Sequence, residues 1–474
     1  MDDALTDLTE LTDLTELPEL LQRAAAAAAE FRAGLPERPV SAEADLEAMR
    51  AAFTAALPEQ PTPASEVLEE LIRTAEPGLT GNAGPRFFGF VIGGGLASAT
   101  AADMLTIGWD QCAFNGVLAP AAIAAEETAA SWLKQVLGIP ETASVGLVTG
   151  GQEANTVALT AARHHVLAEV GWDVERAGLA GAPRVRVVAG EERHATIDRS
   201  LRLLGFGDAV VEPVPADDNG AIDVAQLERV LAEGEPGPLI VCLQAGNVNT
   251  GACDPVGEAA DVAHRHGGWV HVDGAFGLWA AANPRTEHLL AGIEKADSWG
   301  CDAHKWLNVP YDTGFVFVSR PETHAAAVSH SAAYLTGSTE QATGSSFALA
   351  SSRRARGFAV WAALRELGRD GVAELIDRCC RHAKRLAAAL TAGGATIVND
   401  VVINQVLIDV HADADAVAAE VRREGTCWLG ATTWRGRRLL RMSVSNYTTT
   451  AADIDRSAAA VLQAAENVRS AARA

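Results

Sequence analysis

Five short runs of apolar residues, rich in β-branched and aromatic side chains, alternate with helical patterns from about residue 130 onward. The runs cover residues 145–148, 185–188, 239–243, 269–272 and 315–318. Strands that are apolar along their whole length and separated by helices are typical of a mostly parallel sheet with helices on both faces. The sequence therefore predicts a large α/β domain.

The rest of the chain has different patterns, and 474 residues exceed what a single hydrophobic core usually supports. An uninterrupted alanine run at 24–29 and an amphipathic pattern at 65–75 both indicate helices. After residue 356 a long helical pattern leads to short strand-like segments, which indicate an α+β unit with antiparallel strands. We therefore predict an N-terminal helical arm (1–85), a large α/β domain (86–355) and a small C-terminal α+β domain (356–474).

The chain is acidic, with 38 Lys and Arg against 61 Asp and Glu and a formal net charge of −23. This charge repels phosphate backbones and anionic lipids, so we expect neither nucleic acid nor membrane as a partner. The seven cysteines show no CxxC spacing, and the histidine clusters at 164–165 and 264–266 lack further ligands at metal-binding spacing, so no metal is expected. The acidic N-terminus argues against a secretion signal and favours the cytoplasm.

Reactive residues follow several of the predicted strands, where ligands of parallel sheets bind. Gly150 and Gly151 follow the first run, His194 follows the second, Asp273 follows the fourth, and Lys305 lies near the end of the segment SWGCDAHKW. A glycine turn before a helix can bind a phosphate through backbone N–H groups. Together with a histidine to stack on a ring, an acid to pair with a pyridinium and an amine to form a Schiff base, this order matches the requirements of pyridoxal phosphate.

Four longer strings carry a resemblance to a known family: TGGQEANTVALTAAR, VHVDGAFG, DAHKWLNVPYDTG and EGTCWLGATTWRGRRLLRMSVSN. They resemble the group II pyridoxal-phosphate-dependent amino acid decarboxylases, which include aromatic-L-amino-acid, tyrosine and glutamate decarboxylases. The resemblance covers about residues 80 to 465. It implies the aspartate-aminotransferase-like fold (PLP fold type I), pyridoxal 5'-phosphate as cofactor, and a homodimer with the active site at the interface and the arm around the partner.

The resemblance also implies roles for individual residues. Lys305 would hold the cofactor as an internal aldimine and Asp273 would pair with the protonated ring nitrogen. The remaining cofactor contacts would be the glycine turn with Gln152, His304 at the phosphate, His194 and Ala275 on the two ring faces, and Asn247. Gln152 and Asn247 depart from the family, in which many members have Ser or Thr at the first position and Thr at the second.

Lys305 must be unprotonated for part of each catalytic cycle in order to attack a carbonyl. An apolar pocket and a neighbouring cation both lower the pKa of a lysine. Trp306, Val309 and the ring of the cofactor are candidates for the apolar part of that pocket. The sequence therefore suggests a lowered pKa for Lys305.

The family protonates the α-carbon of its quinonoid intermediate from a mobile loop that carries a tyrosine. Here residues 330–346 are rich in Gly, Ser and Thr and contain Tyr334, one of three tyrosines in the chain. Family variants that make aldehydes tend to lack this tyrosine or the stacking histidine, and both are present. We therefore expect an amine product, with an aldehyde synthase, an aminotransferase or a catalytically silent subunit as alternatives.

The substrate side chain is expected to meet aromatic walls. Phe88, Phe90 and Trp109 fall in the part of the chain that lines the substrate pocket in the family. Aromatic walls suit an apolar or aromatic amino acid, and Arg441 lies where relatives have an arginine that can reach the substrate carboxylate. The sequence leaves open which amino acid is used.

Overall fold

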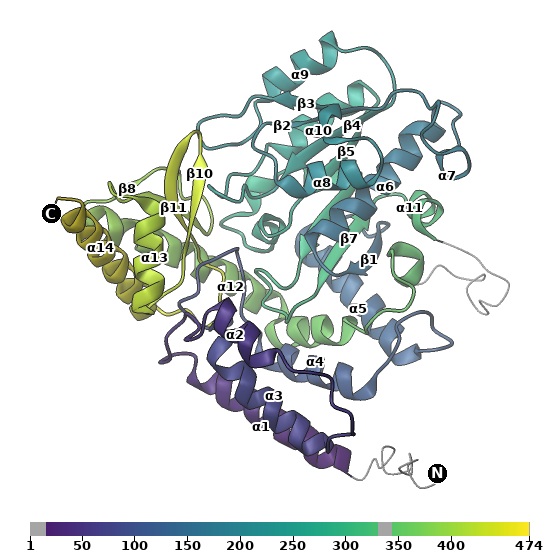
Figure 1. Ribbon diagram of the computed structural model, residues 1–474. Helices are drawn as coiled ribbons and strands as arrows, with labels where there is room; N and C mark the ends of the chain where they lie inside the picture. The colour runs from purple at the N-terminus through teal and green to yellow at the C-terminus, as the bar shows by residue number, and fades with distance from the viewer. Residues whose placement is uncertain (1–15, 330–343, 474) are drawn as a thin grey trace, which may run out of the picture.

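The computed structural model describes residues 16–329 and 344–473. Its main sheet has seven strands in the order β1-β7-β6-β5-β4-β2-β3 (Figure 1). The strands are β1 (Ser144–Val148), β2 (Arg186–Gly190), β3 (Val211–Val214), β4 (Leu239–Gln244), β5 (Trp269–Asp273), β6 (Ser298–Asp302) and β7 (Gly314–Val318).

The sheet is mostly parallel, as predicted. β3, β2, β4, β5 and β6 pair in parallel, whereas β7 runs antiparallel between β6 and β1. All five predicted runs form strands, and the structure adds β3 and β6. The edge strand β3 reads VEPV, and a proline is tolerated at a sheet edge, so this strand lacks the apolar pattern of the others.

Alternate residues of each strand contribute to two hydrophobic clusters, one on each face. In β4, Ile240 and Cys242 belong to the cluster that contains α6, whereas Val241 and Leu243 belong to the larger cluster that contains α10. The sheet is therefore buried on both faces, which explains its continuous apolar strands. The surrounding helices are α5 (Pro120–Leu137), α6 (Gly151–Ala168), α7 (Val174–Ala177), α8 (Ala195–Leu203), α9 (Val224–Glu233), α10 (Val256–Arg265) and α11 (Pro321–Val328).

The C-terminal part contains a second sheet, which is antiparallel as expected. Its order is β10-β11-β9-β8, with β8 (Thr396–Ile397), β9 (Gln405–Asp409), β10 (Gly430–Trp434) and β11 (Arg437–Ser443). The helices of this part are α12 (Gly357–Ala392), α13 (Ala414–Glu424) and α14 (Ala451–Arg473). The limits proposed for the three domains stay a prediction.

The N-terminal helices lie along the lower edge of the molecule in Figure 1. They are α1 (Leu17–Gly34), which contains the alanine run, α2 (Leu46–Phe53) and α3 (Ala64–Ala75), followed by α4 (Ala97–Trp109). None of the first three helices has a buried residue. Across the described ranges, no helix combines the length and the hydropathy needed to cross a membrane.

Candidate active site

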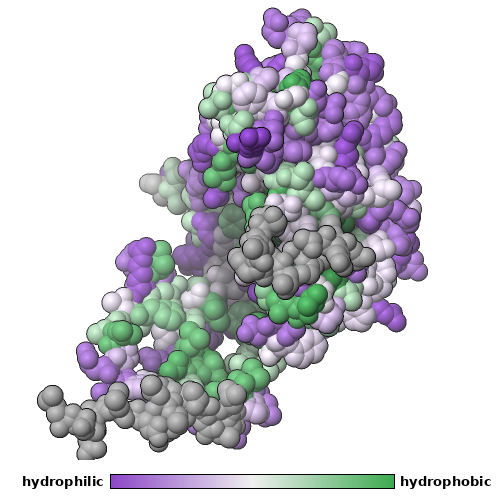
Figure 2. All heavy atoms as spheres, turned by 90° about the vertical axis from the view of Figure 1, so that its right-hand side faces the viewer, coloured by the Kyte–Doolittle hydropathy of each residue, from purple (hydrophilic) through white to green (hydrophobic). Residues whose placement is uncertain are grey.

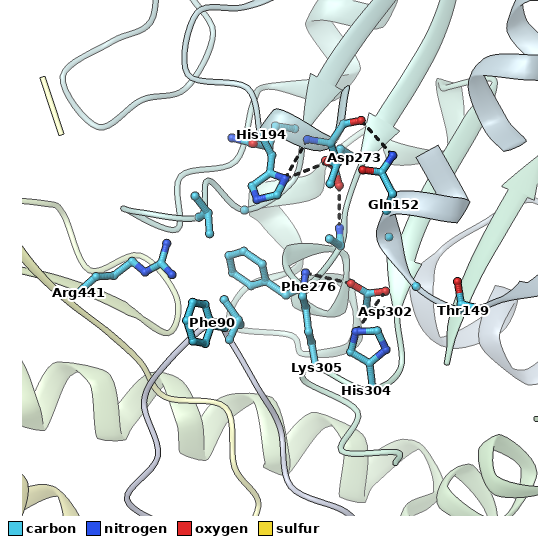
Figure 3. Close-up of a pocket in the computed structure, with 18 residues that line it drawn as sticks. Phe90, Thr149, Gln152, His194, Asp273, Phe276, Asp302, His304, Lys305 and Arg441 are labelled. Atoms are coloured by element: carbon cyan, nitrogen blue, oxygen red, sulfur yellow. Dashed lines mark hydrogen bonds and ion pairs between the residues drawn. The ribbon is translucent and has the colours of Figure 1, made fainter. Parts of the chain in front are cut away.

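A cavity of about 470 Å³ opens at the carboxyl edge of the main sheet (Figure 3). β1, β5 and β6 all end at this edge because they run in the same direction. Segments that follow β2 and β4 complete the rim. The lining residues are Phe90, Val91, Thr149, Gly150, Gly151, Gln152, His194, Thr196, Gln244, Gly246, Val248, Asp273, Ala275, Phe276, Asp302, His304, Lys305 and Arg441.

The glycine turn between β1 and α6 forms a tight cradle. A Cβ atom on Gly150 would lie 2.8 Å from Cε1 of His304, and one on Gly151 would lie 3.3 Å from Cβ of Ala275. Only glycine lets the backbone come this close to its neighbours. Gly151 begins α6, so the first backbone N–H groups of that helix and its positive dipole end lie here. The cradle is suited to an anionic group such as a phosphate.

His304 borders this cradle and is held in a defined orientation. Its Nδ1 accepts a hydrogen bond of 3.2 Å from the backbone N–H of Thr313, and its ring stacks on Tyr311 with centroids 4.3 Å apart. Burial lowers the pKa of His304 despite the charge of Asp302. The ring is therefore neutral, with its proton on Nε2 toward the cavity side.

Asp273, at the end of β5, is 5% exposed and accepts three hydrogen bonds. Its Oδ2 accepts from Asn155 Nδ2 at 3.0 Å and from Thr196 Oγ1 at 3.3 Å. Its Oδ1 accepts from the backbone N–H of Ala275 at 3.2 Å. Hydrogen bonds to a carboxylate favour its charged form, so this site offers a fixed negative charge to the cavity.

His194 caps the N-terminus of α8, and its ring faces the cavity. Its Nδ1 lies 2.9 Å from Thr196 Oγ1 and 3.3 Å from the backbone N of Thr196, which holds the ring in place. Burial lowers the pKa of His194, although the charge of Asp273 opposes the shift. The residue is therefore a neutral, flat group beside the cavity.

Lys305 points its Nζ at the carboxylate of Asp302, 2.9 Å from Oδ2 (Figure 3). Burial alone would lower the pKa of Lys305, but the charge and the hydrogen bond of Asp302 outweigh it and the pKa is raised. The lowered pKa expected for a pocket that includes the cofactor ring stays a prediction, and Asp302 is the charge that opposes it. Trp306 and Val309 do not line the cavity, because both pack fully buried in the core.

Another part of the cavity wall combines apolar groups with one cation. Phe90, Phe276 and Val248 supply the apolar surface, and Arg441 reaches in from β11. Within the described ranges, no hydrogen-bond or ion-pair partner of Arg441 is found, and burial lowers its pKa. A guanidinium without a carboxylate partner in such a wall can bind an anionic group of a ligand.

The structure does not bring every expected residue to this cavity. Phe88 is 1% exposed and packs in the core. Trp109 lies at the end of α4, where it is 52% exposed and contacts Phe358 edge to face. Asn247 binds its own loop instead, because its Oδ1 accepts from the N–H groups of residues 249 and 250 and its Nδ2 donates to the carbonyl of residue 192. Tyr334 lies outside the described residues.

Gln152 lies beside the glycine cradle, but its side-chain amide turns away from it. Nε2 donates to Ser200 Oγ at 2.9 Å, which ties α6 to α8. Sequence reasoning missed three important residues: Asp302, Asn155 and Thr196. Asp302 ends a strand as Asp273 does, and that signal would have found it. Asn155 and Thr196 lie inside helices, and no sequence pattern marks their side chains as partners of Asp273.

These groups fit pyridoxal phosphate. The glycine cradle can bind the phosphate, and Asp273 presents a carboxylate for the ring nitrogen. His194 and Ala275 both line the cavity and offer surfaces for a flat ring, and Lys305 supplies the amine. The buried Oδ1 of Asp302 accepts no hydrogen bond from the described residues and borders the same cradle.

The comparison with known families agrees with this chemistry. A sequence profile described as the pyridoxal-dependent decarboxylase conserved domain matches residues 47–409. The chain belongs to the pyridoxal-dependent decarboxylase family. Its cofactor is accordingly pyridoxal 5'-phosphate, as the resemblance implied.

Two relatives show how far the family similarity extends. Tryptophan decarboxylase 1 of Oryza sativa subsp. japonica is 33% identical over 321 residues, which are 64% of this chain and 62% of the relative. Aromatic-L-amino-acid decarboxylase of Bacillus atrophaeus is 29% identical over 363 residues, which are 75% of this chain and 73% of the relative. The first of these matches therefore spans less than two thirds of the relative's length.

Two solved structures share the fold. The crystal structure of Oryza sativa TDC with PLP and tryptamine has a TM-score of 0.88 at 24% identity, covering 96% of this chain and 99% of that one. The crystal structure of Rhodiola rosea 4-hydroxyphenylacetaldehyde synthase has a TM-score of 0.84 at 20% identity, with 96% and 99% covered. The predicted fold type I architecture is confirmed.

Proposed function

We propose that this family member removes carbon dioxide from an L-amino acid with an apolar or aromatic side chain and releases the corresponding amine. The observation that carries the proposal is a single cavity that contains Lys305, Asp273 and His194 together with an apolar wall and Arg441. The amine, the buried carboxylate and the neutral imidazole are the groups that this cofactor chemistry needs. The wall and the arginine suit the two ends of an amino acid.

Pyridoxal phosphate, when bound, supplies an aldehyde for the amine and a ring that takes up the electron pair released as carbon dioxide leaves. Asp273 would hold a proton on the ring nitrogen, since a carboxylate fixed by three hydrogen bonds favours a cation beside it. His194 would cover one ring face with an uncharged surface. The N–H groups of the glycine turn would neutralise the phosphate. These groups would act on the cofactor and would ease the loss of the carboxylate through it, without donating a proton to the substrate.

The substrate class follows from the part of the cavity wall that combines apolar groups with Arg441. Phe90 and Phe276 would contact an apolar or aromatic side chain, and the guanidinium of Arg441 would bind the carboxylate before it leaves. A carboxylate that must leave the substrate is best bound loosely. This agrees with the position of Arg441, which lies on β11 of the C-terminal sheet, whereas Lys305 belongs to the large domain. The two relatives with the names of tryptophan and aromatic-amino-acid decarboxylases support this class.

Product analysis tests the proposed reaction. The protein loaded with pyridoxal phosphate should convert one or more aromatic L-amino acids to amine and carbon dioxide in equal amounts. Purified protein is incubated with each of the twenty amino acids, with and without 2-oxoglutarate as an amino-group acceptor. Carbon dioxide, amine, aldehyde, ammonia, peroxide and the 2-oxo acid of each substrate are measured. Aldehyde, ammonia and peroxide in place of amine would assign it to the aldehyde synthases, and 2-oxo acid without carbon dioxide to the aminotransferases.

Tyr334→Phe is the matched variant for the same assay. We propose that the Tyr334 hydroxyl delivers the proton to the α-carbon after carbon dioxide leaves. Without it the electron-rich intermediate stays open to oxygen, so amine yield should fall while aldehyde, ammonia and peroxide rise. Cofactor absorbance should stay at the parent value. An unchanged amine rate would assign the proton to another group, with His194 as the next candidate.

We further propose a homodimer whose active site lies at the interface. The three helices α1, α2 and α3 have no buried residue, and large apolar side chains remain exposed on the arm and on the neighbouring α4 and its following loop. Figure 2 shows hydrophobic side chains gathered beside the arm. The most exposed of them are Leu46, Phe53, Leu57, Ile107, Trp109, Val117 and Leu118. Exposed apolar side chains that gather on one side of a molecule favour burial against a second copy.

Light scattering after size exclusion should give twice the 49.4 kDa mass of one chain. Ile107→Asp should shift the protein toward the single-chain mass, because it buries a charge in the proposed interface. Leu203→Asp on α8 is the control, since Leu203 is 65% exposed and Ile107 is 64% exposed. A parent protein with the mass of one chain, or equal effects of the two variants, would contradict the dimer.

A further inference from the structure

A chain of buried hydrogen bonds leads from the core of the main sheet to Asp273. Trp269 Nε1 donates to Ser298 Oγ at 2.9 Å, and Ser298 Oγ is 3.0 Å from His271 Nδ1. His271 Nε2 is 3.0 Å from Asn155 Oδ1, and Asn155 Nδ2 donates to Asp273 Oδ2 at 3.0 Å. The first four residues of this chain are at most 1% exposed. We call these four residues the His271 relay.

The groups at the two ends of the chain of hydrogen bonds fix the direction in which each hydrogen bond is donated. An indole N–H can only donate, so Ser298 Oγ accepts from Trp269 and its own hydrogen is available for His271. At the other end a carboxylate accepts, so the amide of Asn155 must turn its NH₂ to Asp273 and its oxygen to His271. His271 therefore accepts at Nδ1 and donates at Nε2. Each donor in the chain points toward Asp273.

The neutral state of His271 keeps this direction fixed. Burial lowers the pKa of His271 to about 4, although the charge of Asp273 opposes the shift. The ring therefore stays neutral near pH 7, with one donor and one acceptor nitrogen. A fully satisfied buried network of this kind is rigid, since every alternative orientation leaves a polar atom unpaired.

We propose that the His271 relay positions the carboxylate of Asp273 and keeps it ionised toward the ring nitrogen of the cofactor. The relay residues are positioning residues, because they act through Asp273 and do not line the cavity. The inference rests on the proposed role of Asp273 in the preceding section. Supporting hydrogen bonds of this kind fix the orientation of a reactive group and tune its charge.

The test reads the ring nitrogen directly. Pyridoxal phosphate labelled with ¹⁵N at the ring is bound to the holoenzyme, and the ¹⁵N chemical shift is followed from pH 6 to pH 9. The parent should keep the shift of a protonated ring throughout. His271→Leu should make the ring titrate within this range and weaken cofactor binding about tenfold, the smallest loss usual when a supporting hydrogen bond is removed at a metal site.

Two further variants separate the relay from general loosening of the core. His271→Gln can still accept from Ser298 and donate to Asn155, so it should keep the protonated shift. If His271→Leu does not fold, Ser298→Ala breaks the chain by removing one oxygen and should shift the ring nitrogen in the same direction. A parent-like shift in His271→Leu, or in Ser298→Ala where His271→Leu does not fold, would overturn the relay, and so would loss of the shift in His271→Gln.

The matched control is His324, another fully buried histidine whose Nδ1 is 2.9 Å from a serine hydroxyl, Ser144 Oγ. Within the described ranges its hydrogen bonds do not lead to Asp273. His324→Leu should lower thermal stability and leave the ring nitrogen shift unchanged, and an equal shift in this variant would also overturn the proposal. Asp273→Asn tests the role of Asp273 separately from the role of the relay. If this variant leaves the ring nitrogen shift unchanged, the proposed role of Asp273 itself fails.

Discussion

Lys305→Ala should leave no covalently attached cofactor and no measurable turnover. The chain has only four lysines, at 134, 295, 305 and 384, and of these only Lys305 lines the cavity. Borohydride reduction of the parent holoenzyme should therefore fix the cofactor to the peptide that contains Lys305 and bleach its visible absorbance. Peptide mass spectrometry before and after reduction measures the attachment.

Lys295→Ala is the control for this variant. Lys295 is partly exposed and paired with Asp261 on the surface, so its loss should change neither absorbance nor turnover. Attachment of the reduced cofactor to any of the other three lysines would contradict the assignment of Lys305.

Asp273→Asn should reduce turnover by about 10²- to 10³-fold, the usual cost of removing one preorganised electrostatic group from an active site. The amide has nearly the same shape and can keep part of the hydrogen bonding with Asn155 and Ala275. It carries no charge, so the ring nitrogen loses the group that favours its protonation. Single-turnover kinetics with saturating cofactor measure the chemical step apart from cofactor loss.

The control is Asp297→Asn, which changes a buried aspartate at the opposite end of β6 from the cavity. Asp297 Oδ2 accepts hydrogen bonds from Val270 and His264. This variant should lower the free energy of unfolding while turnover per bound cofactor stays near the parent value. Near-normal turnover of Asp273→Asn would instead identify Asp273 as a structural residue.

Sequence reasoning worked where one physical rule governs many residues. Buried parallel strands must be apolar, and their carboxyl ends must meet at one edge, so Asp273, His194 and Lys305 could be grouped from the order of the sequence alone. The rule does not extend to loops, in which the backbone has no regular repeat. Phe88 and Phe90 are two residues apart, yet the first is in the core and the second lines the cavity, because Phe90 and Val91 have positive φ angles.

The environment of Lys305 depended on side-chain directions that composition cannot give. Its apolar neighbours in the sequence, Trp306 and Val309, pack in the core. The carboxylate of Asp302, three residues earlier in the chain, contacts the Lys305 amine instead. The partners of Asp273 were missed for a similar reason. Asn155 and Thr196 belong to two different helices, and only the packing of α6 and α8 on the sheet brings both to one carboxylate.

The contact between Asp302 and Lys305 has a consequence for the way the protein acquires its cofactor. The amine can react with an aldehyde only after it gives up a proton, and an acceptor for that proton already lies 2.9 Å away. Asp302 also lies against the glycine cradle, where a Cβ atom on Gly150 would be 3.2 Å from its Oδ1. The contact therefore holds the Lys305 amine beside the place where the phosphate of the cofactor would bind.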